Sequence, residues 1–151
     1  MSFDARIAQL GITLPDAPAP AANYVPYVQS GNLLFVSGQI SAGPDGLIRG
    51  RLGEDMDAAA GAAAARACGL ALIAQARAAL GSLDRIARVV KLTGFVNSTP
   101  DFTDQPEVVN GCSDLMVEVF GESGRHARAA VSAAALPRGV AVEVEAIFEI
   151  A

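Results

Sequence analysis

Residues 140–150 read Val-Ala-Val-Glu-Val-Glu-Ala-Ile-Phe-Glu-Ile, and this stretch decides the fold. Every second residue from Val140 to Ile150 is apolar, which is the period-two pattern of a strand with one buried face. We expect this apolar row to pack on helices. The opposite face carries three carboxylates and Ile147, and it is either a solvated face or one beside a subunit interface. Its members are Glu143, Glu145, Ile147 and Glu149.

The segments around this strand predict two long helices and further strands. Turn residues 30–32 predict a hairpin over residues 24–39, in which Gly38 marks a bulge or a close backbone approach. Helices are predicted from Asp55 to Leu80 and from Gln105 to Phe120, and strands over 84–96, 127–135 and 140–150. The strand over 84–96 is expected to place Ile86, Val90, Leu92 and Val96 on one face. Two helices on one face of one sheet, in the order ββαβαββ, define an α+β fold.

The two ends of the chain differ in pattern. Residues 1–22 are predicted to form a short helix and a proline-rich arm, and residues 23–151 a single domain. Residues 43–53 hold four glycines and a proline, and we expect a loop there.

Composition limits the possible functions. The 151 residues are 52% hydrophobic and carry a net charge of −5, which excludes a disordered chain and indicates apolar surface buried between subunits. Eleven basic against sixteen acidic residues argue against nucleic acid as a partner, and ribonuclease activity is disfavoured for the same reason. Two cysteines and one histidine are too few for an ordinary zinc site. Neither a membrane span nor a signal peptide is expected, so we predict a cytoplasmic protein.

Arg128 is the first candidate functional residue, because it lies inside the apolar run 127–131. An arginine within a strand needs an anion for its planar guanidinium. Two interpretations stay open here. One is a structural salt bridge to Glu143 or Glu145, and the other is a pocket that captures a small acid.

Several separated motifs resemble the Rid (YjgF-type) family of reactive-intermediate deaminases, also called the endoribonuclease L-PSP family. The stretches 126–131, 136–137 and 142–146 resemble its C-terminal signature, and 26–29 with 36–40 its N-terminal one. Residues 90–96 and 101–102 are similar too, so that the resemblance spans 23–150. It implies a chorismate-mutase-like fold, assembled as a homotrimer with clefts between subunits.

The resemblance also implies an activity, which is hydrolysis of reactive 2-imino or enamine acids to 2-keto acids and ammonia, as in 2-iminobutanoate/2-iminopropanoate deaminases. Arg128 would then bind the substrate carboxylate, and Glu143 would hold the attacking water or the leaving nitrogen. Neither a metal nor another cofactor is implied. The remaining substrate-binding residues would be Tyr27, Ser37, Gly38 and the backbone of Ala130.

The chain departs from the family pattern at three positions. Ala130 stands where many deaminases carry cysteine, Pro100 where they carry asparagine, and His126 where proline is commoner. These departures indicate a distinct subgroup. A non-catalytic module that binds or senses small carboxylates in the same cleft is the alternative function, because Arg128 would serve both.

Overall fold

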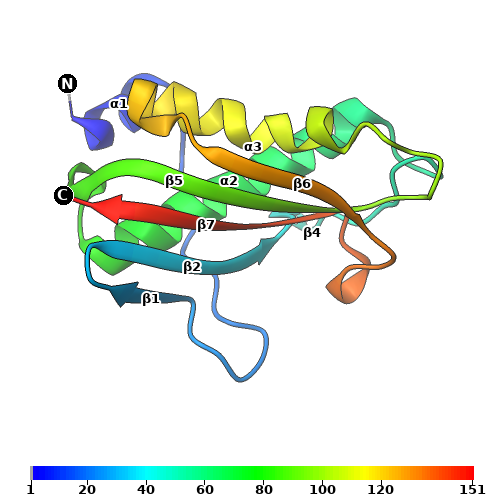
Figure 1. The fold of residues 1–151 in the computed structure, drawn as a ribbon, viewed down its shortest axis with the longest axis horizontal. Coiled ribbons are helices and arrows are strands. Elements are labelled where there is room, and N and C mark those ends of the chain that lie inside the picture. The colour runs from blue at the N-terminus through cyan, green and yellow to red at the C-terminus, as the bar shows by residue number, and fades with distance from the viewer. Residues whose placement is uncertain (1) are drawn as a thin grey trace.

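A computed structural model describes residues 2–151 as one sheet with helices on one face (Figure 1). The long elements lie close to their predicted bounds, and the predicted helix over 105–120 is confirmed residue for residue. The helices are α1 (Phe3–Gln9), α2 (Ala58–Leu80) and α3 (Gln105–Phe120), with short 3-10 turns at Leu83–Arg85, Gly121–Gly124 and Pro137–Gly139. The strands are β1 (Tyr27–Ser30), β2 (Leu33–Ile40), β3 (Ala42–Gly43), β4 (Gly46–Leu47), β5 (Ile86–Asn97), β6 (Ala127–Ala133) and β7 (Val142–Ile150).

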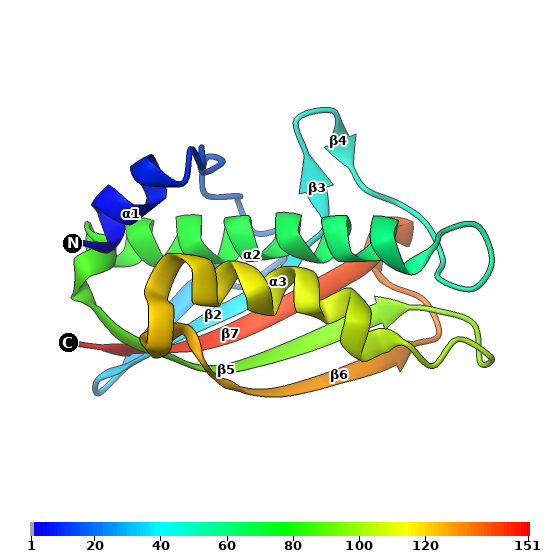
Figure 2. The same cartoon turned by 90° about the horizontal axis from the view of Figure 1, so that it is seen from above.

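The strand that decides the fold lies in the middle of the sheet. The order is β1-β2-β7-β5-β6, in which only β5 and β6 run parallel. Figure 2 shows α2 and α3 side by side across one face, as the α+β prediction requires. The residues of β7 are alternately buried and less buried, so its apolar row meets the helices and its carboxylates lie on the open face.

The prediction for β5 was wrong in one respect. Val89, not Val90, lies in the core, where it is fully buried. Two register shifts against β7, after Ile86 and after Val89, change which residues face the helices. The predicted loop 43–53 holds most of the small β3–β4 ribbon, which begins at Ala42. The short helix predicted within residues 1–22 is α1, which lies on the helical side. Its Ile7 is buried in the core and its Phe3 ring meets Phe120 edge to face.

Small residues allow the two long helices to lie very close together. A Cβ atom at Gly111 of α3 would come within 1.9 Å of the backbone oxygen of Ala62 in α2. A backbone atom cannot swing aside as a side chain can. The alanine-rich sequence of α2 therefore serves close helix packing, as well as helix propensity.

Gly111→Ala is expected to destabilise the protein by about 2 kcal/mol, because α3 must move away from α2 to admit one methyl group. The melting temperature should fall by roughly 4–8 °C. Gly43→Ala is the matched control, since its nearest neighbour would be Ile48 at an ordinary 3.9 Å. Equal melting temperatures for the two variants would contradict the close packing.

By length and hydropathy, α2 is the one helix among residues 2–151 that could cross a membrane. Within the fold, 56% of its most apolar window is buried, as in the core helix of a soluble protein. We interpret α2 as a core helix, and the structure describes no clear transmembrane helix.

Candidate functional site

A chamber of about 750 Å³ lies where β2 continues beyond the end of β1. The N-terminal arm closes one side, β2 and β7 form the floor, and the β3–β4 ribbon and the turn after β6 complete the wall. The walls are mostly apolar, while the floor carries polar groups. Its lining includes Pro18, Tyr24, Ser37, Gly38, Gln75, Arg138, Glu143 and Glu145.

The carboxylate of Glu143 lies directly over Gly38. A Cβ atom at position 38 would stand 2.3 Å from Oε2 of Glu143, so only glycine admits the carboxylate there. The pairing of β2 with β7 shifts register between Val36 and Gln39, which confirms the bulge expected at Gly38. Burial raises the pKa of Glu143, and the nearby carboxylate of Glu145 raises it further. A carboxyl group with a raised pKa holds and returns a proton more readily than an ordinary one.

Ser37 lies beside this carboxylate, but its hydroxyl is already engaged. Its Oγ donates to the backbone oxygen of Val25 (2.8 Å), which ties β2 to the segment before β1. Tyr27 packs partly buried against the core and is not among the residues that line the chamber.

One glutamine holds the arm in place and a second contacts the first, and the sequence analysis missed both. Gln75 of α2 is 1% exposed, and its Nε2 donates to the backbone oxygen of Pro18 (2.6 Å). The same nitrogen contacts Oε1 of Gln39 at 3.4 Å. A glutamine inside an otherwise alanine-rich helix was the available signal. Arg138, also missed, lines the chamber with a φ of 59°, a backbone conformation that favours glycine.

Arg128 lies on the helical side of the sheet, away from Glu143. Its strand neighbour across β5 is the core residue Leu92, and its guanidinium reaches α3. The salt bridge to Glu143 or Glu145 considered above is wrong. The two ion pairs among residues 2–151 are Arg66–Glu118 and Arg125–Glu122. The bonds from Arg128 go from Nη1 to Asn110 Oδ1 (2.8 Å), from Nη1 to Ser113 Oγ (3.1 Å) and from Nη2 to the Pro106 oxygen (3.4 Å).

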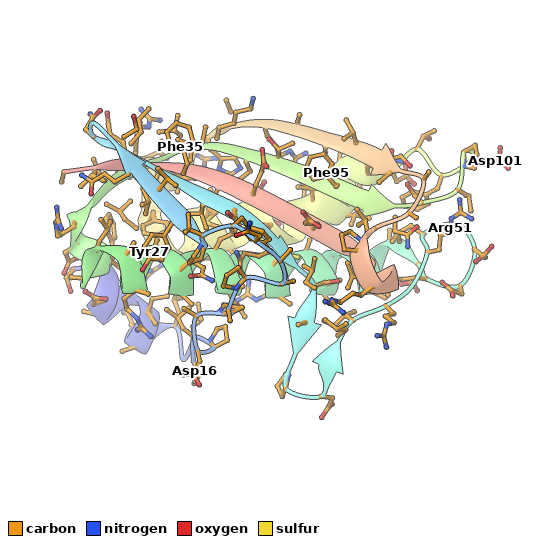
Figure 3. The ribbon with its side chains drawn as sticks, turned by 90° about the horizontal axis from the view of Figure 1, so that it is seen from below. Asp16, Tyr27, Phe35, Arg51, Phe95 and Asp101 are labelled. Atoms are coloured by element: carbon orange, nitrogen blue, oxygen red, sulfur yellow. The ribbon has the colours of Figure 1, made fainter. Side chains whose placement is uncertain are left out.

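The predicted site residues therefore form two groups in one chain. Ser37, Gly38 and Glu143 come together in the chamber, while Arg128 and Ala130 lie on β6, at the edge of the sheet. β5 separates β6 from β7. Figure 3 shows the open face of the sheet between these places, with Phe35 and Phe95 lying on it.

Both cysteines lie in the core, away from the chamber. Cys68 and Cys112 are free and buried, and burial raises the pKa of the Cys112 thiol to about 12. Within residues 2–151, no three His, Cys, Asp or Glu side chains lie close enough together to hold a metal ion.

Comparison with known proteins identifies the family. Residues 4–149 match the family model described as "YjgF/chorismate_mutase-like, putative endoribonuclease". The chain is 55% identical to protein TCP17 of Trypanosoma cruzi, over 97% of this chain and 92% of that one. A solved "putative endoribonuclease" of Shewanella oneidensis superposes with a TM-score of 0.94 at 34% identity, over 99% of both chains. E. coli TdcF with bound serine superposes with a TM-score of 0.62 at 28% identity, over 88% of this chain and 92% of that one. From its motifs, its fold and these relatives, the chain belongs to the YjgF/chorismate-mutase-like family.

Proposed function

We propose that the protein hydrolyses reactive 2-imino acids at clefts between copies of the chain. Water adds to the imine carbon, the carbon–nitrogen bond breaks, and a 2-keto acid and ammonia leave. No electrons are exchanged with any other molecule. The observation that carries the proposal is the half-buried Glu143 carboxyl over Gly38, in a chamber large enough for a small acid.

Each group has a defined task in this reaction. Glu143 takes a proton from water as its oxygen attacks the imine carbon, and returns the proton to the departing nitrogen. Its raised pKa suits both steps. Arg128 holds the substrate carboxylate, because a guanidinium binds a carboxylate with two parallel hydrogen bonds. The serine bound to E. coli TdcF supports a ligand with a carboxylate next to a nitrogen-bearing carbon.

A complete site needs two copies of the chain. Within one copy, Arg128 and Glu143 belong to opposite faces of the sheet and are separated by β5. The open face carries apolar side chains that a second copy would cover. Val28, Phe35 and Val131 are 52%, 41% and 45% exposed. An apolar surface of this kind on a small domain is typical of a subunit interface. We therefore propose a homotrimer, with Arg128 of one copy facing Glu143 of the next.

Light scattering is expected to give a mass of about 46 kDa, three times the 15.4 kDa chain. Phe35→Glu, which puts a charge on the open face, should shift the mass toward the single chain and abolish activity. A stable monomer in the wild type that hydrolyses imines would contradict the intersubunit site.

The proposed activity is tested with imino acids that are generated enzymatically in the assay mixture. An amino acid oxidase generates the imine, semicarbazide traps what is not hydrolysed, and the rate of adduct formation is followed with and without the protein. Substrates with small, branched and aromatic side chains are compared. Faster loss of imine to keto acid supports the proposal. Carboxylate binding without faster hydrolysis on any substrate would overturn it in favour of a binding or sensing module.

A further inference from the structure

We propose that Ser113 and His126 are positioning residues, which aim the Arg128 guanidinium so that its Nε and Nη2 edge meets the carboxylate. The inference rests on the proposed function, since it assumes that Arg128 binds a carboxylate. It extends the site to Ser113 of α3, which nothing in the motifs marks, and gives a role to His126, which the sequence marks only as a departure from the family pattern.

The hydrogen bonds around His126 fix which nitrogen carries the proton. His126 Nδ1 lies 2.6 Å from the backbone oxygen of Gly124, and a carbonyl can only accept. Nδ1 therefore carries the proton, and the neutral ring presents Nε2 as an acceptor. Nε2 lies 2.9 Å from Ser113 Oγ, so the Ser113 hydroxyl donates to it. The oxygen of Ser113 is then left to accept from Arg128, at 3.1 Å.

The hydrogen bonds of Arg128 leave one edge of its guanidinium available. Both hydrogens of Nη1 are used, one by Asn110 Oδ1 and one by Ser113 Oγ. One hydrogen of Nη2 points to the Pro106 oxygen. Among residues 2–151 nothing accepts from Nε. Nε and Nη2 share one edge of a guanidinium, and this edge, which keeps the Nε hydrogen and one Nη2 hydrogen, matches the two oxygens of a carboxylate.

Protonation of His126 breaks this arrangement. A doubly protonated ring would donate from Nε2 to Ser113, whose hydroxyl hydrogen would lose its acceptor. It would also place a second positive charge beside Arg128. Burial holds the pKa of His126 below its ordinary 6.5, as does Arg128, while the bond to Gly124 opposes the shift. We therefore expect the neutral ring near neutral pH, and a loosened Arg128 in acid.

Three other charged residues lie near His126. Arg88 of β5, Arg125 of the preceding turn and Glu149 of β7 line one shallow hollow together with His126. Arg88 is held there by its own bond to the Arg125 oxygen (3.2 Å). Of the charged groups around the ring, Arg128 is the one that lowers the His126 pKa.

The kinetic test distinguishes a Ser113 that orients the Arg128 guanidinium from a Ser113 that only stabilises the fold. Ser113→Ala is expected to raise KM, and the Kd for pyruvate measured by calorimetry, about tenfold. The value of kcat should change less than about twofold, because Glu143 is untouched. Ser113→Thr restores the hydroxyl and should restore both constants. Ser2→Ala is the matched control, since Ser2 also loses a hydrogen-bonded hydroxyl, at the start of α1. Equal constants in wild type and Ser113→Ala would overturn the inference.

The pH test uses the only histidine of the chain. Long-range proton–nitrogen NMR spectra of the wild type should show the proton on Nδ1 at pH 7. KM should rise as the pH falls through the His126 pKa, and His126→Gln, which cannot titrate, should remove that rise. A proton on Nε2 would overturn the inference, and so would a rise of KM at low pH that persists in His126→Gln. Both results can be obtained even if Ser113→Ala fails to fold.

The two proposals fail separately. If pyruvate binding depends on Ser113 but no imine is hydrolysed, the proposal that Ser113 orients Arg128 is supported and the proposed deaminase activity is overturned. If imines are hydrolysed but KM does not change in the Ser113 and His126 variants, the deaminase activity is supported and the orienting role of the two residues is overturned.

Discussion

Arg128→Lys is expected to lower kcat/KM for imine hydrolysis roughly 10- to 100-fold, mainly through KM. Lysine keeps the positive charge but loses the planar pair of donors that binds both carboxylate oxygens. It also cannot keep the contacts to Asn110 and Ser113 while reaching a ligand. Losing a hydrogen bond to a charged group costs about 1.5–3 kcal/mol, which corresponds to this range. The measurement is the semicarbazide competition assay over a range of substrate concentrations.

Arg66→Lys is the matched control for this variant. Arg66 is also an arginine bonded to α3, through Glu118, but it lies on α2 and contacts no proposed site residue. We expect its kcat/KM to equal that of the wild type. Wild-type kinetics in Arg128→Lys would exclude bidentate binding of the substrate carboxylate by Arg128 and leave this residue with a structural role.

Gly38→Ala is expected to reduce kcat about 100-fold or more while leaving the fold nearly as stable. The new methyl group would occupy the space held by Oε2 of Glu143, so the carboxylate must turn away. Displacing a general acid–base group removes a contribution of about 10²–10⁴ to the rate. The clash is with the end of a flexible side chain, so the free energy of unfolding should change by less than about 1 kcal/mol.

Three further variants show whether Gly38→Ala lowers kcat by displacing the Glu143 carboxylate. Gly43→Ala, which meets only ordinary contacts, should behave as wild type. Glu143→Gln should match Gly38→Ala in kcat, and the double variant should lose little more than either, because both remove one group. Additive losses would show that Gly38 acts by some other route.

Strong alternation and turn chemistry made most of the fold predictable. The run from Val140 to Ile150 determined which face of β7 is buried, and Gly38 marked the bulge that brings Glu143 over β2. The register shifts in β5 were not predictable, because residues 86–90 offer apolar side chains at several spacings. Backbone pairing with β7 decides there between Val89 and Val90.

The candidate site was less predictable than the fold. The small residues around Arg128 do not alternate, so the sequence leaves open which face its side chain takes. Its bonds to α3 depend on how that helix crosses β6, and no local pattern encodes the crossing. Gln75 and Ser113 were missed for the same reason, since each contacts residues far away along the chain.

The central position of β7 has a consequence for how the chain folds during synthesis. β7 follows every other strand in the chain, yet it joins β2 to β5 in the finished sheet. A nascent chain that lacks it exposes an unpaired edge on each of these strands, and such edges invite pairing with other chains. Folding of the sheet must therefore wait for release of residues 142–150 from the ribosome. A premature stop before Val142 would leave two half-sheets prone to aggregation.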